Sequence, residues 1–425
     1  MLGTILTMQR HPFWITICLL VLLVTSSCAS SPDLKPTVVP PAHPSPTPFQ
    51  PGVYDLPSSV PTFDSQSIPT FTPYPTIILR NGINPTPAQV SSSNNDRSSI
   101  TIDPLTGLPP ADPILLQRRP LAITVTNYPP YVRPQAGLTL ADVVFEYYEE
   151  PFYTRFFAVF YGNNADMVGP VRSGRYFNEH VVRMYHAFFV FQYADPRELM
   201  YFKSGDLNPF LVLQGSGSCP PFLDPGIHET YNDAFFDIAK WNDCAAQLHL
   251  DNSPQNLRSG FFSETPPSRA LAGNRIFTVY SAFDYNYWQY DPASERYLRY
   301  QETDDTQDNK PASYAPLTDY LNGRQVASDN VVVLFVSHTF MNENEQEDNV
   351  FHINLIDSGN AVVFRNGLAI PAYWVRTDIN QPLLITNLDG SPIYMKPGQT
   401  FFQVIGETST YRTDGTNWYF GYQTP

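Results

Sequence analysis

Apolar and polar positions alternate in a way that divides the chain, from about residue 99 onward, into strands and helices. Runs rich in β-branched and aromatic residues predict four buried strands, at 120–127, 143–148, 155–161 and 188–193. Before the fourth strand, apolar residues recur at helical spacing from Tyr176 onward, which predicts a helix. A second helix is expected at 233–248. This mixture of elements predicts an α/β domain with a mixed sheet for residues 99–265.

Strand patterns dominate the region after residue 275. Between about 257 and 274 the sequence is polar and contains prolines, which indicates a domain boundary. Asn366-Gly367 and Asp389-Gly390 are hairpin signals. We therefore expect a smaller, β-rich second domain over 275–410, built around a small antiparallel sheet. Its predicted strands are at 277–280, 297–300, 330–336, 351–355 and 361–364.

The first residues, 1–28, have the pattern of a signal peptide. The apolar run that begins near Phe13 has about 10 to 12 residues, too few to span a bilayer. Small residues then lead to Cys28, which resembles the lipobox of bacterial lipoproteins, although Thr25 stands where leucine is usual. An ordinary cleaved signal and an uncleaved anchor remain alternatives. All three place the body outside the cytoplasm, and the first attaches it to the cell membrane through a lipid on Cys28.

Residues 29–98 have the composition of a spacer. The segment is rich in Pro, Ser and Thr and has no periodic apolar face, so it buries too little surface to offset the entropy of ordering. We expect a disordered, proline-rich linker in coil or polyproline II conformations. Its length corresponds to roughly 50 Å as random coil and about 200 Å when fully extended. A proline-rich recognition peptide is the alternative.

Charge and cysteine content restrict the partners. The net charge of −15 argues against nucleic acid as a partner. Cys219 and Cys244 form a pair that an exported chain can oxidise to a disulfide, and two unpaired buried thiols are the alternative. The sequence contains no zinc-binding spacing and no nucleotide-binding or hydrolase motif, so we expect no cofactor and no metal.

One segment concentrates basic residues just before the predicted helix. Residues 169–175 contain Arg172, Ser173 and Arg175, and Arg155 lies on the preceding strand. Free N–H groups at a helix start and forked guanidinium groups both bind phosphate or carboxylate, so this segment is a candidate anion site. The alternative is internal ion pairing with acidic residues on the strand before Arg155. The available partners there are Glu146, Glu149 and Glu150.

Several blocks together resemble a known family. In the first half these are RRPLAITVTN, RPQAGLTLADVVFE, TRFFAVF and GPVRSGR, and in the second half DNVVVLFV, AVVFRNG and DGSPIYMKPGQTF. In this order and spacing they resemble the DUF3048 family of bacterial envelope lipoproteins. The resemblance implies an N-terminal α/β part and a smaller β-rich C-terminal part, and it implies no established reaction. Residues 191–196 depart from a His-Ala-Gly-Gly-Ser stretch that such proteins often have.

Three functional hypotheses remain. The leading one is a non-catalytic envelope module that binds an anionic wall component or a partner protein. The second is a metal-dependent enzyme on lipid-linked or wall polymers, from a looser similarity to the LytR-CpsA-Psr phosphotransferases. Carried over by position, the three arginines then face phosphate and Asp142 approaches a metal. The third is a purely structural lipoprotein. No catalytic residue is assigned, and the candidate ligand-binding residues are Asp142, Glu146, Arg155, Arg172, Ser173 and Arg175.

Overall fold

The computed structural model describes most of the chain after residue 100. The described residues are 101–149, 152–215, 218–257, 260–268, 270–341 and 350–423, and all belong to one compact unit. The predicted signal peptide with Cys28, and the predicted linker at 29–98, lie outside these residues. Within the described part of the chain, no helix is both long and apolar enough to cross a membrane.

The first half contains the predicted strands and an additional helix. All four strand predictions are confirmed, because the apolar runs lie in strands whose side chains are almost entirely buried. The helix predicted from Tyr176 is also confirmed, and its apolar residues Phe177, Val181 and Val182 are buried in the core. The elements are β1 (Leu121–Thr126), β2 (Val143–Glu149), β3 (Tyr153–Phe160), α2 (Tyr176–Tyr185), β4 (Phe188–Phe191), α3 (Pro196–Ser204), β5 (Leu211–Leu213), β6 (Phe222–Leu223), β7 (Phe235–Phe236) and α4 (Trp241–Gln247).

The helix predicted at 233–248 is only partly correct, because its first turns have another conformation. The carboxylate of Asp233 accepts three backbone N–H groups, from Gly226, Ile227 and His228, and so holds a turn. The strand β7 follows, and the backbone of Phe236 pairs with that of Val168. Only after Lys240 are the backbone groups free to form the short helix α4.

The second half consists mainly of strands, and it includes the five that the sequence predicts. Long strands are buried along most of their length, whereas β22 at a sheet edge is largely exposed. The strands are β8 (Phe261–Phe262), β9 (Leu271–Ala272), β10 (Arg275–Val279), β11 (Tyr285–Asp291), β12 (Arg296–Glu302), β13 (Tyr314–Pro316), β14 (Ala327–Ser328), β15 (Asn330–Phe340), β16 (Phe351–Asn354), β17 (Asp357–Arg365), β18 (Leu368–Arg376), β19 (Leu384–Thr386), β20 (Tyr394–Met395), β21 (Thr400–Gly406), β22 (Thr410–Asp414) and β23 (Asn417–Gly421).

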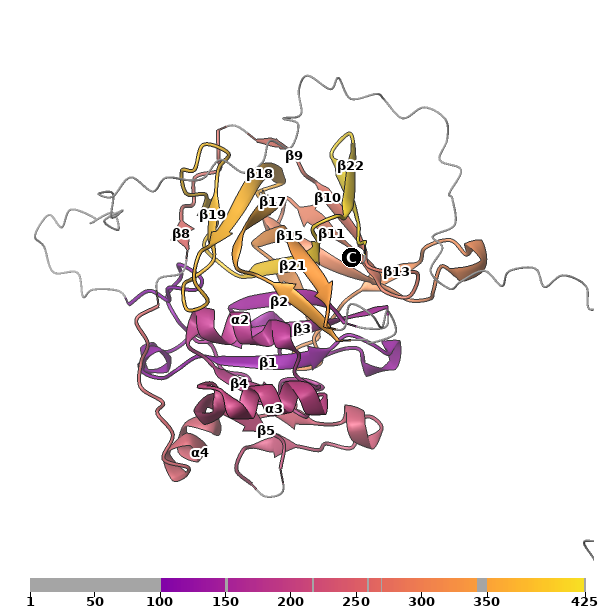
Figure 1. Ribbon diagram of the computed structural model, residues 1–425. Helices are drawn as coiled ribbons and strands as arrows, with labels where there is room; N and C mark the ends of the chain where they lie inside the picture. The colour runs from indigo at the N-terminus through magenta and orange to yellow at the C-terminus, as the bar shows by residue number, and fades with distance from the viewer. Residues whose placement is uncertain are drawn as a thin grey trace, which may run out of the picture. The chain divides into compact units, whose positions relative to one another are not determined.

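A single twelve-stranded sheet runs through both halves of the described chain (Figure 1). Its main path has the order β19-β18-β17-β15-β21-β2-β3-β1-β4-β5. The late strand β21 lies between β15 and β2 and is parallel to both, so Thr400 is paired with Asn330 on one side and with Val143 on the other. All seven residues of β21 are buried. The second half therefore does not form only a small separate antiparallel sheet, because β21 joins it to the first half.

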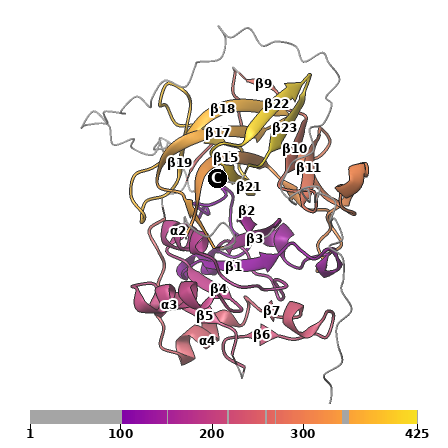
Figure 2. The same ribbon diagram turned by 45° about the vertical axis from the view of Figure 1, so that its right-hand side comes forward.

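A second sheet lies beside these strands in the second half. It has seven strands, with the main path β13-β12-β11-β10-β23-β22, and β10 is parallel to β23. In Figure 2 its strands β22 and β23 run beside β15 and β17. The contact is aromatic, because Phe364 of β17 packs edge-on against Trp418 of β23. The fold is thus an α/β part with a mixed sheet followed by a β-rich part.

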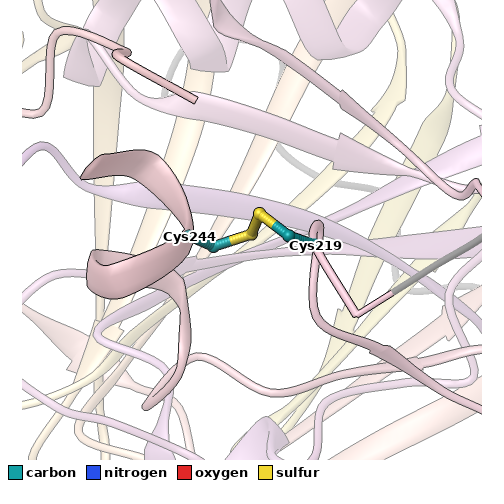
Figure 3. Close-up of a disulfide and its surroundings, with 2 residues drawn as sticks. All are labelled: Cys219 and Cys244. Atoms are coloured by element: carbon teal, nitrogen blue, oxygen red, sulfur yellow. A yellow bond between two sulfur atoms is a disulfide. The ribbon is translucent and has the colours of Figure 1, made fainter. Parts of the chain in front are cut away.

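A disulfide fixes the loop that precedes β6. Cys219 and Cys244 are bonded to each other, with their Cα atoms 5.5 Å apart (Figure 3). Cys244 lies in α4, and Cys219 is followed directly by the segment that leads into β6. The bond therefore ties α4 to the polypeptide that follows β5.

Candidate functional site

The basic segment lies at the carboxyl ends of two parallel strands. The strands β1 and β4 run parallel, and residues 171–174 enter the sheet where they end. The N–H of Arg172 donates to Thr124 O (3.2 Å), and the N–H of Gln192 donates to Arg172 O (3.0 Å). The N–H of Gly174 donates to Tyr193 O (2.7 Å). These hydrogen bonds fix the backbone of the basic segment. Open α/β sheets commonly bind ligands at this edge.

Two of the three arginines share one internal carboxylate. Arg155 is buried and forms an ion pair with Glu149, and its Nη1 also donates to Ser173 O (2.6 Å). Arg175 Nη2 lies 2.5 Å from the same Glu149 oxygen, Oε1. Burial and the neighbouring Arg175 lower the pKa of Arg155 to about 10, against the pull of Glu149, which still leaves it charged at neutral pH. The internal ion pairing expected as an alternative thus applies to Arg155 and Arg175.

The start of α2 is also occupied by a protein carboxylate. The N–H of Tyr176, the first residue of α2, donates to Glu198 Oε1 (3.0 Å). The other oxygen of Glu198 lies 3.7 Å from Arg175 Nη1, and the Glu198 side chain, from α3, is not exposed. A helix start attracts anions, and here Glu198 supplies one from within the fold. The first turn of α2 is therefore already neutralised.

Arg172 differs from the other two arginines. It forms no ion pair with a carboxylate among the described residues, and its side chain is only partly buried. Its guanidinium carbon lies 5.4 Å from the centre of the Tyr231 ring, and its Nη1 is 3.5 Å from Tyr231 O. Gln192 Nε2 donates to the same carbonyl (3.2 Å). Arg172 is thus a charged, accessible group held in place by an aromatic ring and by backbone.

A set of polar side chains continues the surface around Arg172. The hydroxyl groups of Tyr131 and Tyr231 are 3.5 Å apart. The Tyr131 hydroxyl donates to Glu229 Oε2 (3.2 Å) and accepts from Asn232 Nδ2 (2.6 Å). The hydrogen bond with Tyr231 is the main reason that the pKa of Tyr131 rises to about 12, so this phenol stays neutral. Sequence reasoning missed these residues, because nothing in the linear pattern connects two tyrosines one hundred positions apart.

Ser173 lies between Arg172 and Arg175 in the sequence, and it contacts Arg155 through its backbone carbonyl. Its carbonyl accepts from Arg155, and its side chain is only partly buried. The segment therefore uses Ser173 to fix the buried arginine.

Asp142 lies at the other end of the β2–β3 ladder. The register pairs Val143 with Val159 and Tyr147 with Arg155, so five residues, or about 17 Å of strand, separate Asp142 from Arg155. The Asp142 carboxylate accepts the N–H groups of Tyr161 (2.5 Å) and Gly162 (2.9 Å). Burial raises its pKa to about 6, although these donors oppose the shift. The phosphotransferase hypothesis requires Asp142 to lie near the three arginines. The structure does not bring them together.

Glu146 lies in the core between the two halves of the chain. Its carboxylate pairs with Arg299 of β12, and it accepts from Gln403 Nε2 of β21 (3.0 Å) and from Thr154 Oγ1 (3.2 Å). Its side chain is fully buried, so it does not line the surface around Arg172. Across the described residues, His, Cys, Asp and Glu form no group of three or more that could hold a metal ion.

Comparison with known proteins connects both halves to one family. The family described as "Protein of unknown function (DUF3048) N-terminal domain" matches residues 105–218, and the corresponding C-terminal domain matches residues 276–402. The chain is 26% identical over 314 residues to the "Putative lipoprotein YerB" of Bacillus subtilis (strain 168), a match that covers 71% of this chain and 85% of that protein.

A solved structure has a similar fold. The crystal structure of the YerB protein from Bacillus subtilis superposes with a TM-score of 0.57 at 23% identity. The superposition covers 72% of this chain and 96% of that one. At this identity the similarity concerns the fold alone. The two-part architecture described above is therefore shared by that protein.

Proposed function

Since the chain belongs to the DUF3048 family, with both of its domains, we propose that it is a membrane-tethered envelope lipoprotein that binds an anionic group of a wall component through Arg172. The similarity to a protein named as a lipoprotein supports the tether, as does Cys28 at the end of the apolar leader. The linker at 29–98 would hold the body away from the lipid surface on the extracytoplasmic face.

One observation carries the binding proposal. Arg155 and Arg175 both pair with Glu149, and Arg175 also lies near Glu198, whereas Arg172 has no carboxylate partner among the described residues. The charge of Arg172 also acts on Arg155, whose pKa it helps to lower. An anion at Arg172 would relieve this repulsion and could accept two N–H groups of the guanidinium. The arginine is therefore poised for an external carboxylate or phosphate.

The test is thermal unfolding of the full chain with and without anions. Phosphate, pyrophosphate and soluble wall fragments would be the panel, and a ligand at 100 times its dissociation constant should add about 2.7 kcal/mol to the stability of the folded state. Arg172→Ala should abolish this increase. Arg412→Ala is a matched control, because Arg412 also stacks on a tyrosine, 3.8 Å from the centre of the Tyr419 ring. An undiminished increase in the Arg172 variant would disprove the proposal.

A protein partner is a second candidate, and one surface favours it. An open hollow of about 460 Å³ beside α3 is lined by Tyr193, Leu199, Met200 and Lys203 together with two smaller residues. Met200 is 69% exposed and the neighbouring Tyr193 is 52% exposed, and apolar side chains that gather on one surface mark a candidate docking site. Met200→Asp should then abolish cross-linking to an envelope protein in intact cells while Arg172→Ala leaves it unchanged. The reverse result would favour the wall component.

A further inference from the structure

Resting on the proposed function above, we propose that the ligand of Arg172 is an acidic saccharide, whose sugar rings stack on Tyr131 and Tyr231 while its carboxylate pairs with the arginine. The C–H face of a pyranose ring packs against an aromatic face, and its hydroxyl groups seek fixed polar side chains. Both features are present beside Arg172.

Both tyrosines are about half exposed although their side chains are large. Tyr131 is 47% exposed and Tyr231 is 52% exposed. A third tyrosine at the same edge, Tyr193, is 52% exposed, and its carbonyl accepts the N–H of Gly174 in the basic segment. Two exposed tyrosines that lie together beside one arginine indicate a surface that a ligand covers.

The rings are also fixed in position before any ligand arrives. Tyr131 is held at its hydroxyl by Asn232 and by Glu229, and it also contacts the Tyr231 hydroxyl. Arg172 covers part of Tyr231, and Gln192 donates to the Tyr231 carbonyl. Binding would therefore cost little side-chain entropy, since these side chains already have partners.

The distribution of charge favours a sugar acid over a compact polyanion. Arg172 supplies one positive group over the Tyr231 ring, and the exposed carboxylate of Glu229 accepts from the Tyr131 hydroxyl, which lies beside the Tyr231 hydroxyl. A carboxylate repels phosphate oxygens but accepts hydrogen bonds from hydroxyl groups. A ligand that suits both groups presents a carboxylate to Arg172 and hydroxyl groups to Glu229.

The experiment is calorimetric titration of the full chain with a tetrasaccharide of alternating N-acetylglucosamine and N-acetylmuramic acid. Chitotetraose, which has no carboxylate, and pyrophosphate are the comparison ligands. The acidic tetrasaccharide should bind the wild-type chain, and chitotetraose should bind at least about tenfold more weakly because it cannot pair with Arg172. Tyr231→Leu and Tyr131→Leu should each weaken the acidic tetrasaccharide by about tenfold.

Two controls separate this inference from the function on which it rests. Tyr411→Leu removes a tyrosine of equal exposure from the distant strand β22 and should leave the affinity unchanged. Should one tyrosine variant unfold, the other one still provides the test. Pyrophosphate binding that depends on Arg172, without saccharide binding or without an effect of either tyrosine, would overturn the saccharide and leave the anion site intact. No Arg172-dependent binding of any ligand would overturn both.

Discussion

Glu146 and Arg299 form a bidentate ion pair between two fully buried side chains, with N–O distances of 2.8 and 2.7 Å. Glu146 lies on β2 in the first matched domain, and Arg299 lies on β12 in the second. The guanidinium group also packs over Phe156, Trp288 and Phe401. The contact between the two halves is therefore part of the core and not a surface association.

The first prediction concerns this ion pair. Glu146→Gln leaves the charge of Arg299 buried without compensation, so the free energy of unfolding should fall by about 3 to 5 kcal/mol. Urea denaturation measures this change, and the wild-type chain should unfold in one transition reported equally from both halves. Glu295→Gln is the control, because Glu295 is exposed and its ion pair with Lys396 is 3.7 Å long. Two separate transitions in the wild-type chain would contradict the shared core.

The second prediction separates the arginines. Glu149→Gln removes the carboxylate that Arg155 and Arg175 share, and it should lower the free energy of unfolding by about 3 kcal/mol. Arg172→Ala removes a partly exposed side chain and should change it by less than about 0.5 kcal/mol. Equal losses in the two variants, measured by urea denaturation, would mean that Arg172 is as structural as its neighbours.

The third prediction is a pH dependence of stability. Burial raises the pKa of Glu302 from 4.5 to about 8, against the opposing effect of Arg133, whose Nη2 lies 2.5 Å from Glu302 Oε1. Asp284, in the same buried cluster, has a pKa raised to about 6 by burial and by Glu146. The folded state thus holds protons that the unfolded state releases. The contribution of these two groups to stability should therefore fall as the pH rises from about 4.5 to about 8.

The variant Glu302→Gln tests this sign. It removes one of the titrating groups, so the loss of melting temperature between pH 5 and pH 8 should become smaller. Asp103→Asn is a parallel variant outside the cluster, since burial and Asp142 raise the pKa of Asp103 to about 8 as well. Should both variants keep the full wild-type slope, the dependence must arise from other groups.

The fourth prediction concerns the disulfide. Its cysteines are 25 residues apart, and closing a loop of this length stabilises a fold by about 3 kcal/mol in the chain-entropy model. A reducing agent should therefore lower the melting temperature of the wild-type chain. The double variant Cys219→Ser, Cys244→Ser should already show the lower value and should not respond further. A response of the double variant would trace the effect to something other than this bond.

The sequence predicted the elements that contain long runs of β-branched and aromatic residues or a clear helical period. The strands β1 to β4 are such runs, and α2 shows a clear helical period. The strand β21 was missed, because Gln403 leaves apolar runs of only two residues on either side of it. Gln403 is stable in the core because its amide donates hydrogen bonds to Glu146 and to Asn286. When the hydrogen-bond partners of a buried polar residue are distant in the sequence, the residue cannot be distinguished from the end of a strand by the sequence alone.

The candidate site was predictable only as a group of residues. The sequence showed three arginines and nearby acidic residues, and it offered ion pairing and anion binding as alternatives. To choose between these alternatives, one must know which arginines lie within ion-pair distance of Glu149. The sequence alone does not give that distance. The tyrosines were invisible for a similar reason, since Tyr131 and Tyr231 meet only through loops that follow different strands.

The position of β21 also constrains how the protein is made. Residues 400–406 close the gap between β2 and β15, so while the chain is still emerging from a ribosome or a translocation pore, β2 has an open edge. An unpaired strand of this kind attracts other chains and invites aggregation. The first half therefore completes its sheet only after residues 400–406 have been synthesised. A chain truncated before residue 400 would keep the open edge of β2 and would be bound by chaperones or degraded by proteases.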